Sequence, residues 1–357
     1  MLGRLQGLRA VAAYMVVVFH CIEYVNSLGL GMPRLPVGAA GVDLFFVISG
    51  FIMVYVAGAR ETPAGFAINR IARIAPLYWV ATLAAAALAF THPWVFPAAR
   101  IDLQSVLASL AFIPAPDARN MLSPVLFIGW TLNFEMMFYL LFVISMLAPR
   151  RFRIALLLAL MTAVFCIGNV VPRGTSFNFY GAPIIFEFGA GCLIATALQS
   201  PTVTAWLKRI PPWALIGAGS VLLAATWRTD PSSWMRPIQW GGPAVLIVLG
   251  VVLLDVTRAP ARNRFVIALG DASYSAYLLH PFLVALLAPP LQKLLGISWL
   301  ESATFLATAV VGTMALSLFS YRFFEIPARD LVRGIHRSLG GPPFGPKPGA
   351  PLGRSQP

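Results

Sequence analysis

Long apolar blocks alternate with short polar segments along the whole chain. A helix needs roughly 20 consecutive, mostly apolar residues to cross the hydrocarbon core of a bilayer, and ten blocks of about this length can be placed on the sequence. We therefore predict an all-α integral membrane protein, a bundle of about ten transmembrane helices. The predicted spans cover approximately 8–26, 38–58, 74–91, 124–148, 154–172, 179–199, 211–227, 237–254, 265–288 and 299–321.

The segments between the blocks are short, except for residues 92–123. Within that loop, the sequence DLQSVLASLAF favours a helix that lies on the membrane surface. After Arg337 the chain continues as GGPPFGPKPGAPLGRSQP, whose proline and glycine content is typical of disorder. The predicted organisation is a transmembrane domain at 1–337 followed by a disordered cytoplasmic tail at 338–357.

Composition supports the membrane assignment and argues against some classes of function. Hydrophobic residues make up 59% of the chain and charged residues 11%, with a mean hydropathy of +0.79, whereas a soluble domain carries roughly 25% charged residues. The net charge of +13 could suggest nucleic-acid binding, but the cations lie in short clusters between apolar blocks, as topology selection produces. We therefore expect no nucleic-acid partner. The three cysteines lie within apolar blocks without metal-ligand spacing, which predicts neither a disulfide framework nor a metal site.

Membrane orientation follows from the distribution of lysine and arginine. Seven of the 26 cations fall on one side of the ten predicted spans, and the other 19 fall on the side that holds both termini. Because cytoplasmic loops carry the excess of lysine and arginine, both termini are predicted to be cytoplasmic. The seven are Arg34, Arg100, Arg119, Arg173, Arg228, Arg236 and Lys293.

Ionisable residues inside the blocks are functional candidates, because a charge at the bilayer centre costs roughly 2.5–3.5 kcal/mol on insertion scales. Arg9 and His20 are eleven positions apart in LRAVAAYMVVVFH. At 100° per residue they share one helix face, about 16 Å apart along the axis. The alternative is a snorkelling arginine with a histidine that is bonded to a neighbouring helix.

Two carboxylates also fall within predicted spans. Asp43, in GVDLFFVISGF, is expected at about the depth of His20, where it could bond one imidazole nitrogen and leave the other as a base. Its alternative role is to cap the outer end of the helix. Glu135, in WTLNFEMMFYLLF, must be neutral or paired, and His20 or an arginine is a plausible partner. Gly41 and Gly50 would let neighbouring helices approach closely.

Further polar groups occur at helical spacing. Arg70 and Arg73 are three residues apart and so share a helix face, where paired guanidinium forks suit phosphate groups. Simple positive-inside anchoring is the alternative. Tyr139 follows Glu135 by four residues, while Tyr277 and His280 fall near one face of the predicted span 265–288. We expect one polar cavity, with a guanidinium-lined cytoplasmic mouth below a reactive centre in the membrane interior.

Six motifs in this order resemble the acyltransferase-3 family of multi-pass membrane acyltransferases, and the resemblance covers the chain to about residue 333. They are LRAVAAYMVVVFH, GVDLFFVISGF, RIARIAPLYW, WTLNFEMMFYLLF, SYSAYLLH and FFEIPAR.

The resemblance implies transfer of an acyl group, commonly acetyl from acetyl-CoA, to a hydroxyl of a surface polysaccharide, a glycolipid or another glycosylated acceptor. Acyl-CoA is thus expected as a donor substrate, with no permanently bound cofactor, and the bacterial inner membrane, with its lipid, as the location. One departure is that Pro281 follows His280 directly. The implied catalytic residues are His20, Asp43 and Glu135; the acyl-CoA-binding residues Arg9, Arg70 and Arg73; the acceptor-binding residues Tyr139, Tyr277 and His280.

Two chemical routes are compatible with these residues. His20 could remove the proton from the acceptor hydroxyl for direct attack on the thioester, or could itself accept the acyl group first. A secondary transporter or flippase that uses the same buried groups is the rival function, although no repeat symmetry is visible in the sequence. A nonenzymatic scaffold would leave the many buried charges unexplained.

Overall fold

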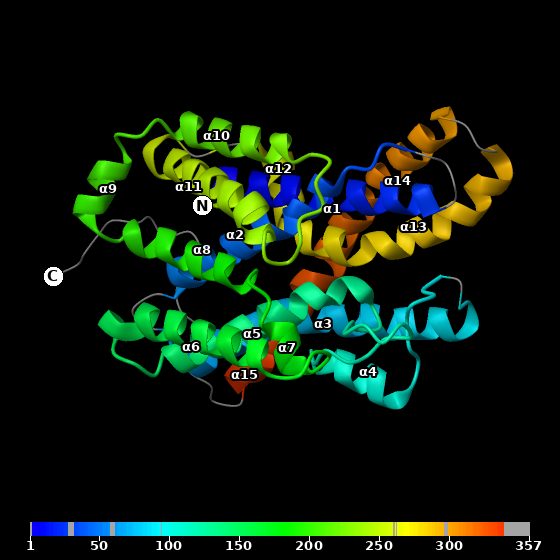
Figure 1. Ribbon diagram of the computed structural model, residues 1–357, viewed down its shortest axis with the longest axis horizontal. Coiled ribbons are helices and arrows are strands. Elements are labelled where there is room, and N and C mark those ends of the chain that lie inside the picture. Colours follow the sequence, from blue (N-terminus) through cyan, green and yellow to red (C-terminus); the bar gives the residue numbers. More distant parts are fainter. Residues whose placement is uncertain are drawn as a thin grey trace.

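The chain folds into helices throughout the part that the structure describes. The computed structural model describes residues 2–27, 32–57, 61–93, 95–259, 261, 263–295 and 299–338. Apart from one isolated β-bridge between Pro116 and Leu122, every regular element in these residues is a helix (Figure 1). The prediction of an all-α protein is therefore confirmed.

The helices are α1 (Gly3–Ser27), η1 (Pro36–Ala40), α2 (Gly41–Val56), α3 (Pro63–Thr91), α4 (Leu103–Leu110), η2 (Phe127–Gly129), α5 (Trp130–Ser145), α6 (Arg150–Val170), α7 (Ser176–Tyr180), α8 (Ile185–Ala197), α9 (Pro201–Leu207), α10 (Pro212–Ala225), η3 (Pro237–Gly241), α11 (Gly242–Thr257), α12 (Arg264–Asp271), α13 (Ser273–Leu295), α14 (Trp299–Ser320), η4 (Tyr321–Glu325) and α15 (Ile326–Ser338).

Seven helical segments of the described chain are long and apolar enough to cross a membrane. Three further apolar helices, Ile185–Ala197, Pro212–Ala225 and Ser273–Leu287, coincide with predicted spans but are shorter. The chain is thus an integral membrane protein, and a total of ten spans stays a prediction. The seven segments are Gly3–Ser27, Pro36–Val56, Pro63–Thr91, Phe127–Ser145, Arg150–Val170, Pro237–Thr257 and Glu301–Ser338.

Several boundaries differ from the predicted spans. The helix predicted to begin at residue 74 begins at Pro63, because Thr62 caps it by accepting a hydrogen bond from the Gly65 amide at 3.1 Å. The predicted span 265–288 is two helices, α12 and α13, separated at Ala272. The helix predicted in the long loop is present as α4, and its position on the membrane surface stays a prediction. The predicted tail at 338–357 lies outside the described residues, apart from the last residue of α15.

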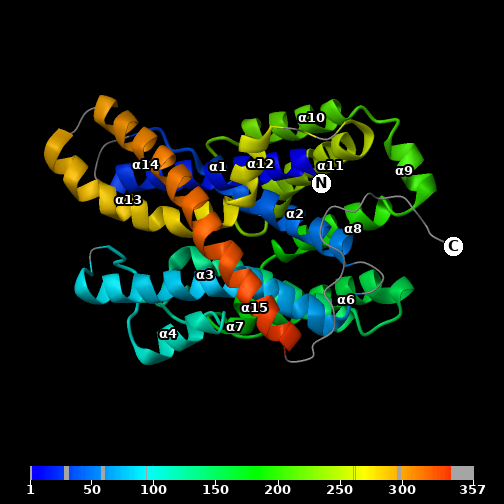
Figure 2. The same cartoon turned by 180° about the vertical axis from the view of Figure 1, so that it is seen from behind.

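The helices form two layers, which both views show (Figures 1 and 2). One layer contains α1, α2 and the helices from α8 to α13, and the other contains the helices from α3 to α7. The C-terminal helices α14 and α15 run obliquely from the first layer to the second, where α15 packs against α3 (Figure 2). Residues far apart in the sequence are thereby brought to the interface between the layers.

Glycines allow α2 to pack backbone against backbone on two neighbours. A methyl group on Gly41 would overlap the carbonyl oxygen of Ala12 in α1, and one on Gly50 would overlap that of Phe188 in α8. The predicted close approach at Gly41 and Gly50 is therefore confirmed. These contacts fix the position of α2, which carries side chains into the interface between the layers.

The contact at Gly50 gives a test of this packing. We expect Gly50→Ala to destabilise the protein by about 1–3 kcal/mol, the usual cost of overpacking, because backbone atoms must move to admit the methyl group. Thermal unfolding in detergent, followed by tryptophan fluorescence, measures the effect. Gly217→Ala is the matched control, since a methyl group there meets no atom within 4 Å. Equal melting temperatures for the two variants would contradict the packing described.

Candidate active site

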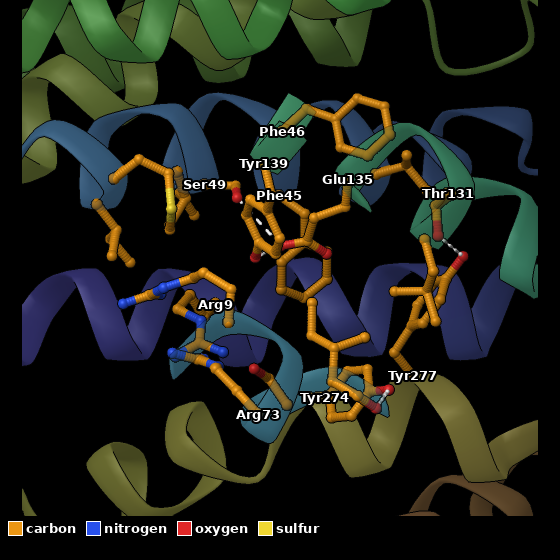
Figure 3. Close-up of a pocket in the computed structure, with 18 residues that line it drawn as sticks. Arg9, Phe45, Phe46, Ser49, Arg73, Thr131, Glu135, Tyr139, Tyr274 and Tyr277 are labelled. Atoms are coloured by element: carbon orange, nitrogen blue, oxygen red, sulfur yellow. Dashed lines mark hydrogen bonds between the residues drawn. The ribbon is translucent and has the colours of Figure 1, made fainter. Parts of the chain in front are cut away.

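A cavity with about 730 Å³ of space between its atoms, including its open part, lies among α1, α2, α3, α5 and α13. Its two ends differ in chemistry (Figure 3): Arg9 and Arg73 lie at one end, Thr131 and Tyr277 at the other, and the Glu135 and Tyr139 side chains lie between them. The cavity is therefore polarised along its length.

The arginine end is formed by α1 and α3. Arg9 is buried, and its Nη1 donates a hydrogen bond to Oε1 of Gln6 at 2.9 Å. Arg70 is also buried, with its guanidinium carbon 5.4 Å from the centre of the Phe66 ring and its Nε without a hydrogen-bond partner. Arg73 is half-buried. Because Arg70 and Arg73 are one helical turn apart on α3, both reach the same end of the cavity.

Glu135 occupies the centre of the cavity. Its Oε1 accepts hydrogen bonds from the Ser49 hydroxyl at 3.1 Å and from the Tyr139 hydroxyl. Among the described residues that line the cavity, Glu135 is the single carboxylate against three arginines. The cavity therefore carries an excess of positive charge, which suits an anionic ligand with several phosphate oxygens.

Tyr277 closes the other end. Its hydroxyl donates to the backbone carbonyl of Ile128 at 2.9 Å and lies 2.9 Å from the Thr131 hydroxyl. Its ring meets Phe45 edge to face at a centroid distance of 6.2 Å, and the centroid of the His280 ring lies 6.1 Å away on α13. Tyr277 thus lines the cavity and also lies next to His280.

His20 and His280 form a hydrogen-bonded pair. Nδ1 of His20 lies 2.9 Å from Nε2 of His280, although the two residues are 260 positions apart in the chain. His280 is fully buried and His20 is half-buried. The ring of Phe127 packs edge to face on His20 at a centroid distance of 5.4 Å. The imidazole of His20 is therefore held on two sides.

The expectation of a single cavity that contains both arginines and His20 is wrong for this structure. Neither His20 nor His280 is among the residues that line the cavity. Tyr277 precedes His280 by one helical turn, lines the cavity, and has its ring centroid 6.1 Å from that of His280. The sequence spacing correctly places Arg9 and His20 on one helix, α1, but it does not show that only Arg9 lines the cavity.

The predicted hydrogen bond between Asp43 and His20 is also wrong. The Asp43 carboxylate accepts from Nη2 of Arg236 at 2.8 Å and from its Nε at 3.1 Å, a two-pronged ion pair in which Asp43 is fully buried. Glu187, from the first turn of α8, lies beside the pair. A guanidinium fork is a stronger partner for a carboxylate than a neutral imidazole, which accounts for the preference. In this structure Asp43 therefore pairs with Arg236 and not with His20, and its catalytic role stays a prediction.

Sequence reasoning missed the role of Arg236. That residue was expected to be a loop cation on the outer side, yet it packs over Trp240, with 4.9 Å between its guanidinium carbon and the ring centroid, and it pairs with Asp43. The sequence feature that could have indicated a buried position for Arg236 is its place directly before Pro237 and an apolar block. Ser49 and Thr131 were missed because hydroxyl residues in apolar helices are common and carry no spacing pattern.

Comparisons with known proteins agree on one family. An acyltransferase-domain model, that of the acyltransferase-3 family, matches residues 2–322. The exopolysaccharide production protein ExoZ of Rhizobium meliloti is 37% identical, and the match covers 91% of this chain and 98% of ExoZ. Peptidoglycan O-acetyltransferase OatA of Listeria monocytogenes is 25% identical over 91% of this chain and 55% of OatA.

A third relative, acyltransferase MdmB of Streptomyces mycarofaciens, is 25% identical over 89% of this chain and 87% of its own length. No solved structure matches the chain. Because the family model covers nine-tenths of the residues and the similarity to ExoZ extends over nearly the whole of both proteins, the chain belongs to the acyltransferase-3 family of membrane acyltransferases.

Proposed function

We propose that this protein transfers an acyl group, most simply acetyl, from cytoplasmic acyl-CoA to a hydroxyl of a surface polysaccharide or glycolipid. The observation that carries the proposal is the polarised cavity, with three arginines at one end and a tyrosine that touches a histidine pair at the other. The proposed location is the cytoplasmic membrane of a bacterium, with both termini and the arginine end facing the cytoplasm.

The arginine end suits the phosphate groups of coenzyme A. Arg70 offers a buried Nε–H without a partner, and Arg73 reaches the same end of the cavity. Each guanidinium group can donate two parallel hydrogen bonds to phosphate oxygens. The pantetheine arm would then extend past Glu135 and Tyr139 toward Tyr277. Because the histidines do not line the cavity and Tyr277 both lines it and lies next to His280, the proposed transfer includes a movement of the Tyr277 side chain.

His20 is the proposed general base. It removes the proton from the acceptor hydroxyl, the acceptor oxygen forms a bond to the thioester carbonyl carbon, and the carbon–sulfur bond breaks. The protonated His20 then returns its proton to the departing thiolate, so that the products are the ester and the free thiol. A route in which His20 first carries the acyl group uses the same residues.

The acceptor class rests on the relatives. One is a peptidoglycan O-acetyltransferase and another an exopolysaccharide production protein. Both names refer to a surface polymer that contains sugars, which supports a carbohydrate hydroxyl as the proposed acceptor. Surface glycans of cells with and without the protein, compared by mass spectrometry, would identify the modified sugar.

The donor site is tested by charge removal. Arg70→Gln combined with Arg73→Gln should weaken acetyl-CoA binding by at least about tenfold, since one charge-assisted hydrogen bond contributes about 1.5–3 kcal/mol. Titration calorimetry on the purified protein measures the affinity. Arg150→Gln combined with Arg151→Gln is the matched control, because it removes two charges from exposed arginines at the start of α6, outside the cavity. Unchanged affinity in the double variant at Arg70 and Arg73 would exclude these two arginines from the donor site.

The base is tested by His20→Ala. Transfer from acetyl-CoA to a glycan acceptor should fall by about 10²–10⁴, the usual contribution of a general base, while acetyl-CoA affinity stays at the wild-type value. His92→Ala, which alters an exposed histidine after α3, should transfer normally. Wild-type turnover in the His20 variant would contradict the proposed mechanism.

A further inference from the structure

The two histidine rings meet in a geometry that restricts where their protons lie. The ring centroids are 5.0 Å apart, the ring planes differ by 18°, and the facing nitrogens are 2.9 Å apart. The distance between the nitrogens is shorter than the distance between the ring centres by almost the sum of the two distances from each nitrogen to its own ring centre. The nitrogens therefore lie close to the line that joins the two centres, and the rings meet edge to edge. The contact is therefore an in-plane N–H···N hydrogen bond.

The backbone of α13 fixes the proton of His280. Its Nδ1 lies 3.2 Å from the carbonyl oxygen of Ala276, and a carbonyl can only accept, so Nδ1 carries the hydrogen. The Tyr277 carbonyl is a second acceptor in the same turn, because Pro281 has no N–H to donate to it. In a neutral ring with a hydrogen on Nδ1, Nε2 is bare and accepts.

The hydrogen in the bond between the rings must then belong to His20. If Nε2 of His280 accepts, Nδ1 of His20 is the donor, and Nε2 of His20 keeps its lone pair. The opposite assignment needs a doubly protonated His280. That ring is fully buried, and among the described residues its hydrogen-bond partners are His20 and backbone carbonyls of its own helix, none of them a carboxylate. A buried cation without a counter-ion is costly.

We propose that His280 is a positioning residue that sets the tautomer of His20 and leaves Nε2 of His20 free as the basic nitrogen. The hydrogen-bond chain runs from His20 Nδ1–H to His280 Nε2, and from His280 Nδ1–H to the backbone of α13. His280 thereby fixes the tautomer and orientation of His20, as a carboxylate does for the catalytic histidine of many enzymes. The proline after His280, which departs from the spacing expected from related sequences, supports this chain by freeing a carbonyl.

The role in catalysis rests on the proposed function. When Nε2 of His20 takes the proton of the acceptor hydroxyl, Nδ1–H continues to donate to His280, so the charged ring keeps its orientation. The same Nε2–H then protonates the thiolate. Without the acceptor nitrogen of His280, His20 could exchange its tautomer and present Nε2–H to the hydroxyl, which cannot remove a proton.

Nitrogen NMR tests the tautomer without any activity measurement. The chain has four histidines, so His92→Asn and His336→Asn in the ¹⁵N-histidine-labelled full chain leave only the pair. We expect Nδ1 of His20 to carry a hydrogen, its Nε2 to be bare, and a coupling across the N–H···N bond to Nε2 of His280. A hydrogen on Nε2 of His20 with a bare Nδ1 would overturn the assignment.

Two substitutions at His280 test the positioning role. His280→Leu removes the acceptor and should lower kcat on the order of 10- to 100-fold, as for other groups that orient a histidine, with KM for acetyl-CoA unchanged. His280→Gln keeps an acceptor oxygen and should recover kcat at least in part, although it fills the site no better than leucine.

Different experimental results would contradict the positioning role of His280 and the proposed transferase function. Equal kcat losses in the leucine and glutamine variants, at equal melting temperatures, would overturn the positioning role while His20→Ala still reports on the transferase mechanism. A correct tautomer in a protein that transfers no acyl group from acyl-CoA would refute the proposed function and leave the hydrogen-bond chain intact.

Discussion

Hydrocarbon offers no hydrogen bonds, so the polar side chains that this protein carries between its helices need partners inside the protein. Among the described residues, three groups of contacts that provide such partners lie in or near the candidate site: the hydrogen bonds that Glu135 accepts from two hydroxyls in the cavity, the Asp43–Arg236 ion pair, and the His20–His280 bond. Each group joins helices that are distant in sequence. The polar contacts therefore position the helices and also form the candidate active site.

Tyr277 connects the first of these groups to the last. Its hydroxyl is held by α5 and the turn before it, its ring lines the cavity, and its neighbour one turn along α13 is His280. In the present arrangement the arginine end is separated from His20. In the proposed mechanism, this separation would keep the thioester away from His20 until Tyr277 moves, which would limit hydrolysis of the donor.

The sequence predicted relations within one helix better than relations between helices. Arg70 and Arg73 on α3, and Glu135 with Tyr139 on α5, lie together as their spacing requires. The partner of Asp43 was not predictable in this way, because Arg236 is 193 residues away and its surroundings read as a loop. The roles assigned to His20, Glu135 and the three arginines stay predictions until activity is measured.

The structure of the protein with a non-hydrolysable acetyl-CoA analogue, in which a methylene group replaces the thioester sulfur, would show whether the cavity brings the donor to His20. We expect phosphates on Arg70 and Arg73, a pantetheine arm that passes Glu135, a Tyr277 ring turned out of its present position, and the acyl carbonyl carbon beside Nε2 of His20. An analogue bound away from the arginines, or one whose acyl end stops at an unmoved Tyr277, would contradict the proposed mechanism.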